Sequence, residues 1–234
     1  MATGYNYITM TVILAALYDN GKGAILVSDK MRTVEHPQVS KKSTAEAPDV
    51  VKIEKLNDYV YMLHAGNMDL CLPYIEELKR EIRQDDKPRK VIRKAAGIYR
   101  KYRQKDVENK VLLHYGFNSM DEYKHAQNLS AELVSLLDDK ITHYFSPFDL
   151  ILVCLEDDVY SIYGLADPGF FMSQSFGSAV TGSGARFAME VVTQEHTKSM
   201  SKDKVKEVLL KAKKMAEQDE HVGAETEIVE LPEV

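Results

Sequence analysis

The spacing of apolar and polar positions predicts strands and helices that come in blocks rather than in strict alternation. Short apolar runs bounded by turn-forming residues are typical of strands, and they occur at residues 12–18, 24–29, 50–56, 59–65, 149–155, 159–163, 170–174 and 225–231. The first two runs flank Asn20-Gly21, a dipeptide that supplies the positive φ angles of a hairpin turn. Residues 34–49 are polar and contain two prolines, so a loop is expected there.

Apolar residues at three- and four-residue spacing predict helices between and after these strands. The expected helices cover residues 68–82, 87–105, 129–141, 185–195 and a stretch after Ser201 with an apolar stripe from Val205 to Met215. Residues 106–128 are polar and are expected to be irregular. Because strands and helices are grouped, the pattern indicates an α+β fold in which helices pack outside antiparallel sheets.

Composition narrows the class of protein. The 234 residues suffice for one domain with a sizeable core, and a net charge of −6 gives no general reason to expect a nucleic acid or an anionic membrane as partner. Cys71 and Cys154 lie far apart in apolar surroundings, which favours buried thiols in a reducing compartment. The chain has no apolar run of about 18 residues and no secretory pattern at its start, so we expect a cytoplasmic protein.

One segment is strongly basic, in contrast to the net negative charge of the whole chain. Residues 87–105 contain nine lysines and arginines and no acid, and Val91, Ala95, Ile98 and Tyr102 would line one side of a basic amphipathic helix. Such a helix could bind a nucleic acid or an acidic partner protein. It could equally be a solvated face balanced by acids elsewhere, and the acidic balance of the whole chain favours that second interpretation.

A threonine at the beginning of the first strand raises a chemical question. Thr11 directly follows Met10. A threonine hydroxyl is a weak nucleophile until a base takes its proton, and the α-amine of the same residue can be that base when the threonine begins the chain. An unperturbed α-amine has a pKa of roughly 7.7–8.0, close to working pH. Such a site also needs a cation, an acid that holds it and donors for an oxyanion.

An ordered set of residues resembles the proteasome β-type family of amino-terminal-nucleophile hydrolases. The residues similar to the family's nucleophile, catalytic aspartate, catalytic lysine, oxyanion-hole glycine, neighbouring serine and site-holding aspartate are Thr11, Asp29, Lys52, Gly66, Ser183 and Asp219. The likeness covers roughly residues 9–83 and 129–231, with 84–128 as an insertion that carries the basic helix. Val222 stands where the family usually has a serine or threonine, and Met31 where it has an arginine.

The resemblance implies one domain over residues 1–234 with a four-layer αββα sandwich of two stacked antiparallel sheets flanked by helices. It implies acyl transfer without metal or cofactor, and a substrate side-chain pocket lined by Arg32, Val50, His64 and Met68. Several of these residues keep a structural alternative. Thr11 could be an ordinary strand threonine, and Asp29 and Lys52 could form a structural salt bridge, although a lysine in an apolar run favours a functional pair. His64 could be a satisfied core histidine, and Ser183 could cap the helix that follows it.

The way in which the threonine becomes the first residue also stays open. Thr9 and Thr11 share strand parity, and alignment of the first two strands favours Thr11. Translation could begin at Met10, or residues 1–10 could be a propeptide. Three functions are compatible with the pattern: a threonine peptidase that acts on peptides or unfolded proteins in a homo-oligomeric ring, a transpeptidase similar to connectases, and a non-catalytic structural subunit.

Overall fold

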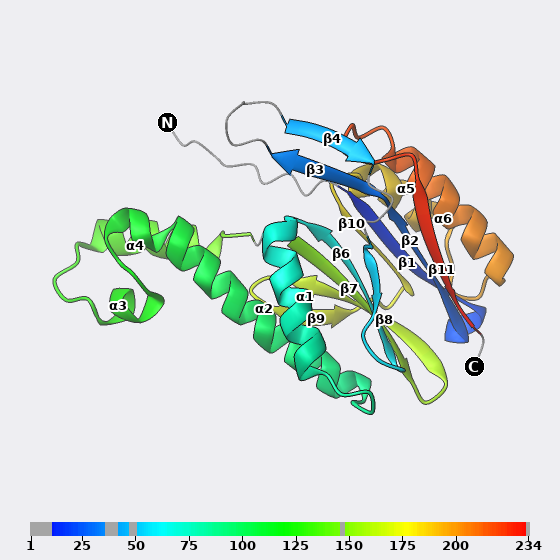
Figure 1. Cartoon of the computed structure of the whole chain (residues 1–234), viewed down its shortest axis with the longest axis horizontal. Coiled ribbons are helices and arrows are strands. Elements are labelled where there is room, and N and C mark those ends of the chain that lie inside the picture. The colour runs from blue at the N-terminus through cyan, green and yellow to red at the C-terminus, as the bar shows by residue number, and fades with distance from the viewer. Residues whose placement is uncertain (1–10, 36–41, 47–50, 146–147, 233–234) are drawn as a thin grey trace.

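Two stacked antiparallel sheets form the centre of the molecule in the computed structural model, which describes residues 11–35, 42–46, 51–145 and 148–232 (Figure 1). The first sheet has the order β10-β1-β2-β11, with strands Ser178–Gly182, Val12–Tyr18, Gly23–Asp29 and Thr226–Leu231. The second has the order β5-β6-β7-β8-β9, with strands Ile53–Lys55, Val60–Gly66, Phe148–Glu156, Val159–Ala166 and Phe170–Ser173.

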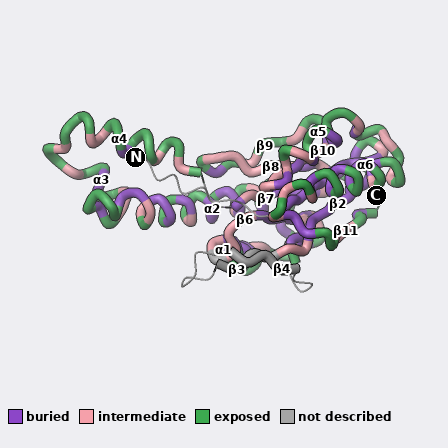
Figure 2. Tube along the Cα trace, turned by 90° about the horizontal axis from the view of Figure 1, so that it is seen from above, coloured by how far each residue is buried: buried purple, intermediate pink, exposed green. Residues whose placement is uncertain are grey.

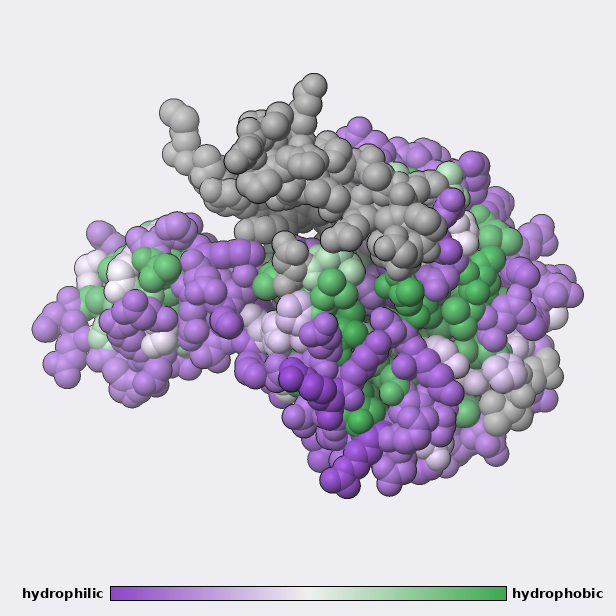
Figure 3. Space-filling view, in the orientation of Figure 1, coloured by the Kyte–Doolittle hydropathy of each residue, from purple (hydrophilic) through white to green (hydrophobic). Residues whose placement is uncertain are grey.

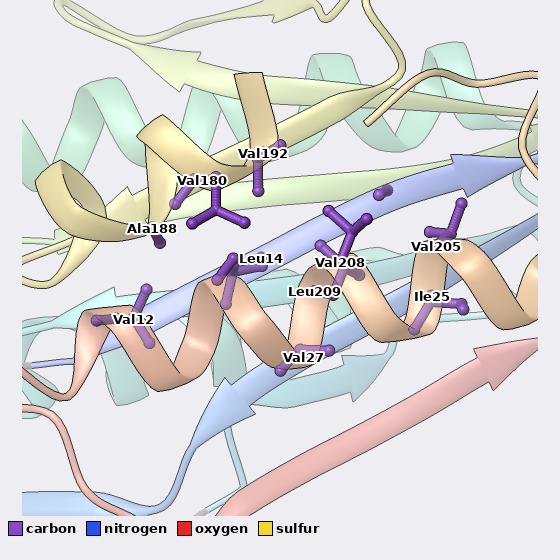
Figure 4. Packing of buried hydrophobic residues seen from close by; sticks show 14 of the residues in the cluster. Val12, Leu14, Ile25, Val27, Val180, Ala188, Val192, Val205, Val208 and Leu209 are labelled. Carbon is purple, nitrogen blue, oxygen red and sulfur yellow. The ribbon is translucent and has the colours of Figure 1, made fainter. Parts of the chain in front are cut away.

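Helix pairs cover the outer faces of both sheets (Figure 1). Helices α5 (Ala185–Glu195) and α6 (Lys202–Ala216) lie on the first sheet, and α1 (Met68–Glu81) and α2 (Pro88–Lys110) lie on the second. Figure 4 shows the packing of the first pair, in which strand residues meet helix residues such as Ala188, Val192, Val205, Val208 and Leu209. The α+β sandwich with two antiparallel sheets and flanking helices is therefore confirmed.

Burial on both faces explains the composition of the central strands. Every residue of β1 and β2 is buried, because one side of each strand faces α5 and α6 and the other faces the second sheet. A strand covered on both sides is continuously apolar rather than alternating. At the turn between them, Asn20 and Gly21 have positive φ angles of 59° and 93°, as the sequence predicts. Cys71 and Cys154 are buried free thiols, also as expected.

Residues 103–145 form a projecting unit that extends away from the sandwich (Figure 2). It contains the end of α2, the 3-10 helix η2 (Leu112–Tyr115), α3 (Met120–His125) and α4 (Ala131–Thr142). A separate apolar cluster holds these helices together, with the buried members Val107, Val111, Leu112, Phe117, Tyr123 and Leu137. The face of this unit seen in Figure 3 is mostly hydrophilic, which fits a unit surrounded by solvent.

Arg103 fastens the projecting unit to the sandwich. Its guanidinium donates to the Asp167 carboxylate at 3.1 Å, and to the carbonyls of Ile141 and Tyr144 at 3.0 and 2.8 Å. Asp167 follows β8, whereas the two carbonyls belong to the end of α4 and the segment after it. One buried cation therefore joins three parts of the chain, and it caps carbonyls that a helix end leaves without partners.

Most cations of the basic helix α2 are paired with other groups of the same chain. Five of its cations form ion pairs, which are Arg89–Glu156, Lys90–Asp86, Lys94–Asp86, Lys101–Glu77 and Arg103–Asp167. Lys87 lies over the Tyr59 ring, 4.0 Å from its centroid. Balance by acids elsewhere in the chain accounts for these residues, and a partner protein on α2 stays a prediction. Across the residues that the structure describes, no helix has both the length and the apolarity needed to cross a membrane.

Two segments differ from their predicted structure, one strand was not predicted, and one helix buries a different face. Within residues 34–49, expected to be a loop, residues 34–35 and 42–46 belong to the hairpin of β3 (Met31–Glu35) and β4 (Lys42–Glu46), whose backbone pairing does not need an apolar run. Residues 36–41 and 47–49 of this segment lie outside the described residues. Residues 106–128 are largely helical rather than irregular, and the Ser119 hydroxyl caps α3 by accepting from Glu122 N–H at 3.0 Å. Strand β10 and its small residues were not expected. The buried face of α6 also differs from the predicted apolar stripe, since Met215 is exposed while Lys213 and Ala216 are buried.

The α6 packing predicts different stability effects for two adjacent leucines. Leu209 is fully buried against β1 and β2, whereas Leu210 is 37% exposed. Replacement of Leu209 by alanine should lower the free energy of unfolding by about 2–5 kcal/mol, and Leu210→Ala should cost clearly less. Urea unfolding of both variants measures the difference. Equal destabilisation would contradict this packing, since the two substitutions share the same change in helix propensity.

Candidate active site

Among the described residues, the Asp29 carboxylate accepts five hydrogen bonds at one end of the sandwich. It lies at the end of β2 and is fully buried. Its five donors are the Thr11 hydroxyl, Lys52 Nζ at 2.8 Å, and the backbone N–H groups of Val12, Met31 and Gly223 at 3.0, 3.1 and 3.1 Å. A buried carboxylate is stable only with such compensation. The donors come from four parts of the chain, so Asp29 joins them at one point.

Thr11 is held by its side chain and by its backbone. Its hydroxyl donates to Asp29 and accepts from Lys52 Nζ. Its backbone N–H donates to Ser183 Oγ at 3.3 Å, and its carbonyl accepts from the Ser183 hydroxyl at 3.4 Å and from Gly184 N–H at 3.3 Å. The threonine is 1% exposed. These contacts place its hydroxyl oxygen beside both a carboxylate and an ammonium group.

Lys52 is the cation of this site and is nearly fully buried, one residue before β5. Burial lowers the pKa of Lys52 and is the largest influence on it, while Asp29 and Glu227 oppose the shift and Lys213 adds to it. Glu227, on β11, also accepts from the Lys52 backbone N–H at 3.4 Å and from the Ser28 hydroxyl at 3.2 Å. A lysine in this setting gives up its proton more readily than a solvated one.

The loop after α6 delivers one of the five donors. Lys213 is buried and donates to Glu217 at 2.7 Å and to the Ala224 carbonyl at 2.6 Å, which fixes both ends of the loop that contains Gly223. Within that loop the Asp219 carboxylate accepts from the backbone N–H and the ring of His221, each at 3.0 Å. Asp219 therefore supports the site through the loop that brings Gly223 to Asp29.

Sequence reasoning missed Lys213 and Glu227. A lysine four residues after Leu209 falls on the apolar side of its helix, and this position was the available signal for Lys213. Glu227 had no local signal, because only the pairing of β11 with β2 sets it opposite Ser28 and near Lys52.

Glycines allow the close approach of chain segments at this end. A Cβ at Gly182 would lie 2.3 Å from the Thr11 carbonyl oxygen, and its φ of 102° also requires glycine. Gly66, at the end of β6, has a φ of 119°. It lies two residues after His64, whose N–H is bonded to the Lys52 carbonyl at 3.1 Å. Gly66 is thereby positioned at the same end of the two sheets as Lys52.

The helix-cap alternative for Ser183 is not what the structure shows. The N-cap position of α5 is Gly184, without a side-chain cap, and the Ser183 hydroxyl bonds to Thr11 instead. Ser183 is thus part of the Thr11 surroundings.

Of the four residues expected to line a substrate pocket, the structure describes the side chains of His64 and Met68. His64 is buried, and its Nε2–H donates to the Val51 carbonyl at 3.1 Å. Its Nδ1 is a buried atom for which the described residues provide no hydrogen-bond partner. Met68 begins α1 and is partly exposed. Arg32 lies in β3, but its side chain, like all of Val50, falls outside the described residues.

Comparison of the chain with protein-family models and with curated protein sequences finds no match. The functional argument therefore rests on the site itself. No group of three or more His, Cys, Asp or Glu side chains in the described part of the chain is arranged to hold a metal ion. What the site offers is a hydroxyl, a buried lysine, a buried carboxylate and backbone donors.

The His64 environment predicts a pH-dependent stability. Burial, with Lys52 as the next cause, lowers the pKa of His64 to about 4, so the unfolded chain binds a proton near pH 6.5 and the folded chain does not. The wild type should lose up to about 3 kcal/mol of stability as pH falls from 6.5 to 4. In His64→Gln this loss should be absent.

Urea unfolding at several pH values measures the effect, and His114→Gln, at an exposed position, is the matched control. Equal pH slopes for wild type and His64→Gln would show that His64 is not the titrating group.

Proposed function

We propose that this chain is a threonine hydrolase of the amino-terminal-nucleophile type, which cleaves peptide bonds through an acyl-enzyme as in the proteasome β-type family that it resembles. The observation that supports this most is the Thr11 hydroxyl, bonded at once to Asp29 and to Lys52 in a buried site. A strand threonine with only a structural role needs no such partners. Burial of the lysine and the carboxylate carries a desolvation cost, which is typical of functional sites.

The chemistry follows from the contacts once Thr11 is the first residue. Its α-amine takes the hydroxyl proton while Oγ attacks the carbonyl carbon of the substrate. The positive charge of Lys52 next to Oγ favours the developing alkoxide, and Asp29 holds Lys52 at 2.8 Å. The Gly66 N–H would stabilise the tetrahedral oxyanion.

The same amine completes the reaction. It gives its proton to the leaving nitrogen, so that the peptide bond breaks and a threonine ester remains. It then takes a proton from the water that attacks this ester, and it returns that proton to Oγ as the acyl group leaves. Ser183, whose Oγ lies 3.3 Å from Thr11 N, would orient the amine.

Release of Thr11 is the condition for this reaction. Removal of Met10 after a start at that codon, or removal of residues 1–10 as a propeptide, would provide it. The contacts described for Thr11 use its own nitrogen, carbonyl and hydroxyl, so they do not require the preceding residues. Peptides or unfolded proteins are the proposed substrates, and a homo-oligomeric ring and a cytoplasmic location are proposed with them.

The projecting unit favours transpeptidation as a second candidate. Residues 103–145 form a folded surface beside the sandwich (Figure 1), which could hold one particular protein while a second amine, instead of water, attacks the acyl-enzyme. A non-catalytic subunit would leave the buried lysine and carboxylate without a purpose, and it is the weakest of the three functions.

Chains with different starts test the role of Thr11. A chain translated from Met10 and trimmed to Thr11 should form a covalent adduct with a threonine-directed peptide epoxyketone, seen as a mass increase of one inhibitor. A chain blocked in front of Thr11, and Thr11→Ala, should form none. Intact-mass spectrometry reads all three. A folded chain that begins at Thr11 and stays unmodified would refute the nucleophile assignment.

Lys52→Arg tests the cation. Because the guanidinium cannot reproduce the geometry of the ammonium between Thr11 and Asp29, kcat on short fluorogenic peptides should fall by about 10²–10³-fold. Lys55→Arg, on the exposed side of the same segment, should retain full activity. Unchanged kcat in Lys52→Arg would exclude Lys52 from the chemistry.

An added amine peptide distinguishes hydrolysis from transpeptidation, since a product in which the two peptides are joined indicates transpeptidation.

A further inference from the structure

We propose that a cavity between β8 and β10 is a second binding site, which takes an organic cation: an ammonium or guanidinium group on an apolar chain, paired with Asp149. The cavity has a volume of about 500 Å³ and is lined by residues of β7, β8, β10 and α5. Figure 2 shows β8, β10 and α5 near one another at one edge of the sandwich. Neither Thr11 nor Lys52 lines it, so the proposal does not rest on the proposed reaction.

The walls of this cavity are mainly apolar. They include Ile151 and Leu165 from the second sheet, Val180 from β10 and Val192 from α5. Two further lining residues, Phe176 and Met189, are 85% and 43% exposed. Large apolar side chains that remain exposed beside a hollow are typical of a ligand site. The apolar part of a ligand would be buried here.

Asp149 gives the cavity its charge. Its carboxylate accepts from the Thr181 hydroxyl at 2.8 Å and from the Gly182 backbone N–H, and no lysine or arginine of the described chain forms an ion pair with it. Burial raises the pKa of Asp149, and the nearby Asp167 raises it further. Asp167 is already bonded to Arg103 and Tyr99. A cation in the cavity would lower the cost of a partly buried carboxylate that no described lysine or arginine neutralises.

The other polar lining residues do not supply a compensating charge. His196 donates from Nε2 to the Leu17 carbonyl at 2.9 Å, and burial lowers the pKa of His196, so its ring is neutral at pH 7. Gln174, Ser178 and Thr193 are uncharged. An anion would therefore meet only the charge of Asp149, and a neutral hydrocarbon would leave that charge unpaired. A cation with an apolar body is the class that fits both features.

Matched probes test the charge requirement on the full chain. We expect n-hexylammonium to bind at least about 10-fold more tightly than 1-hexanol, because hydrogen bonds to a charged group are the stronger ones. Calorimetry measures the affinity, and NMR shifts of the Thr181 and Gly182 amides locate the ligand. Asp149→Asn, which keeps an acceptor for Thr181, should abolish the preference for the cation. Asp203→Asn, in the first turn of α6, is the control and should change nothing.

A second variant tests the cavity itself. Ala179 lines it and is partly exposed, so Ala179→Phe should fill the space and weaken both probes while Asp149 stays in place. Thr11→Ala should bind like the wild type, which separates this proposal from the hydrolase proposal. Equal affinity for the two probes, or an unchanged preference in Asp149→Asn, would overturn it.

A third probe identifies the source of the cation. Acetyl-leucyl-lysine amide carries its ammonium on a peptide. Binding that is lost in Asp149→Asn would support a peptide ligand. If only hexylammonium binds in this way, the cation class stands and a free amine is the ligand.

Discussion

The five bonds accepted by the Asp29 carboxylate are the constraint on which the rest of the site depends. The carboxylate is wholly inside the protein, where a charge without partners would be strongly destabilising. Its partners come from the start of β1, the start of β3, the residue before β5 and the loop before β11. One buried carboxylate therefore joins four segments of the chain at this end of the sandwich.

The charges around Asp29 are balanced over a wider region than the site alone. Two carboxylates, Asp29 and Glu227, lie near Lys52. The ion pair of Lys213 with Glu217 fixes the loop that contains Gly223. The pKa of Lys52 is lowered by burial in spite of two acidic neighbours, so desolvation prevails over attraction. The protein thus holds a cation whose proton is less tightly bound than in water, without exposing that cation.

The sequence was most informative where a residue type has one dominant physical reason. Asn20-Gly21 predicted the turn of the first hairpin, because few other residues accept the positive φ angles of that turn. The resemblance to the proteasome β-type family pointed to Thr11, Asp29, Lys52 and Ser183, which the fold brings into contact. A lysine in an otherwise apolar segment is also conspicuous by itself, because its burial without a partner would be costly.

The sequence was least informative where a position gains its meaning from another segment. The hairpin of β3 and β4 is polar because its strands pair with each other rather than cover a core. Strand β10 is short, and its pairing with β1 shows only in three dimensions. Glu227 is recognisable only through the pairing of β11 with β2. His64 kept two interpretations, and its burial with an Nδ1 that no described residue bonds fits neither of them fully.

The projecting unit has a consequence for how the molecule moves in solution. It makes the chain long in one direction (Figures 1 and 2), whereas a compact domain of 234 residues has a radius of gyration of about 17 Å. A single copy is therefore expected to exceed that value and to diffuse like a heavier sphere. Because the continuous helix α2 and the bonds of Arg103 together hold the unit to the sandwich, the hydrodynamic size of one copy reports on whether this connection persists in solution.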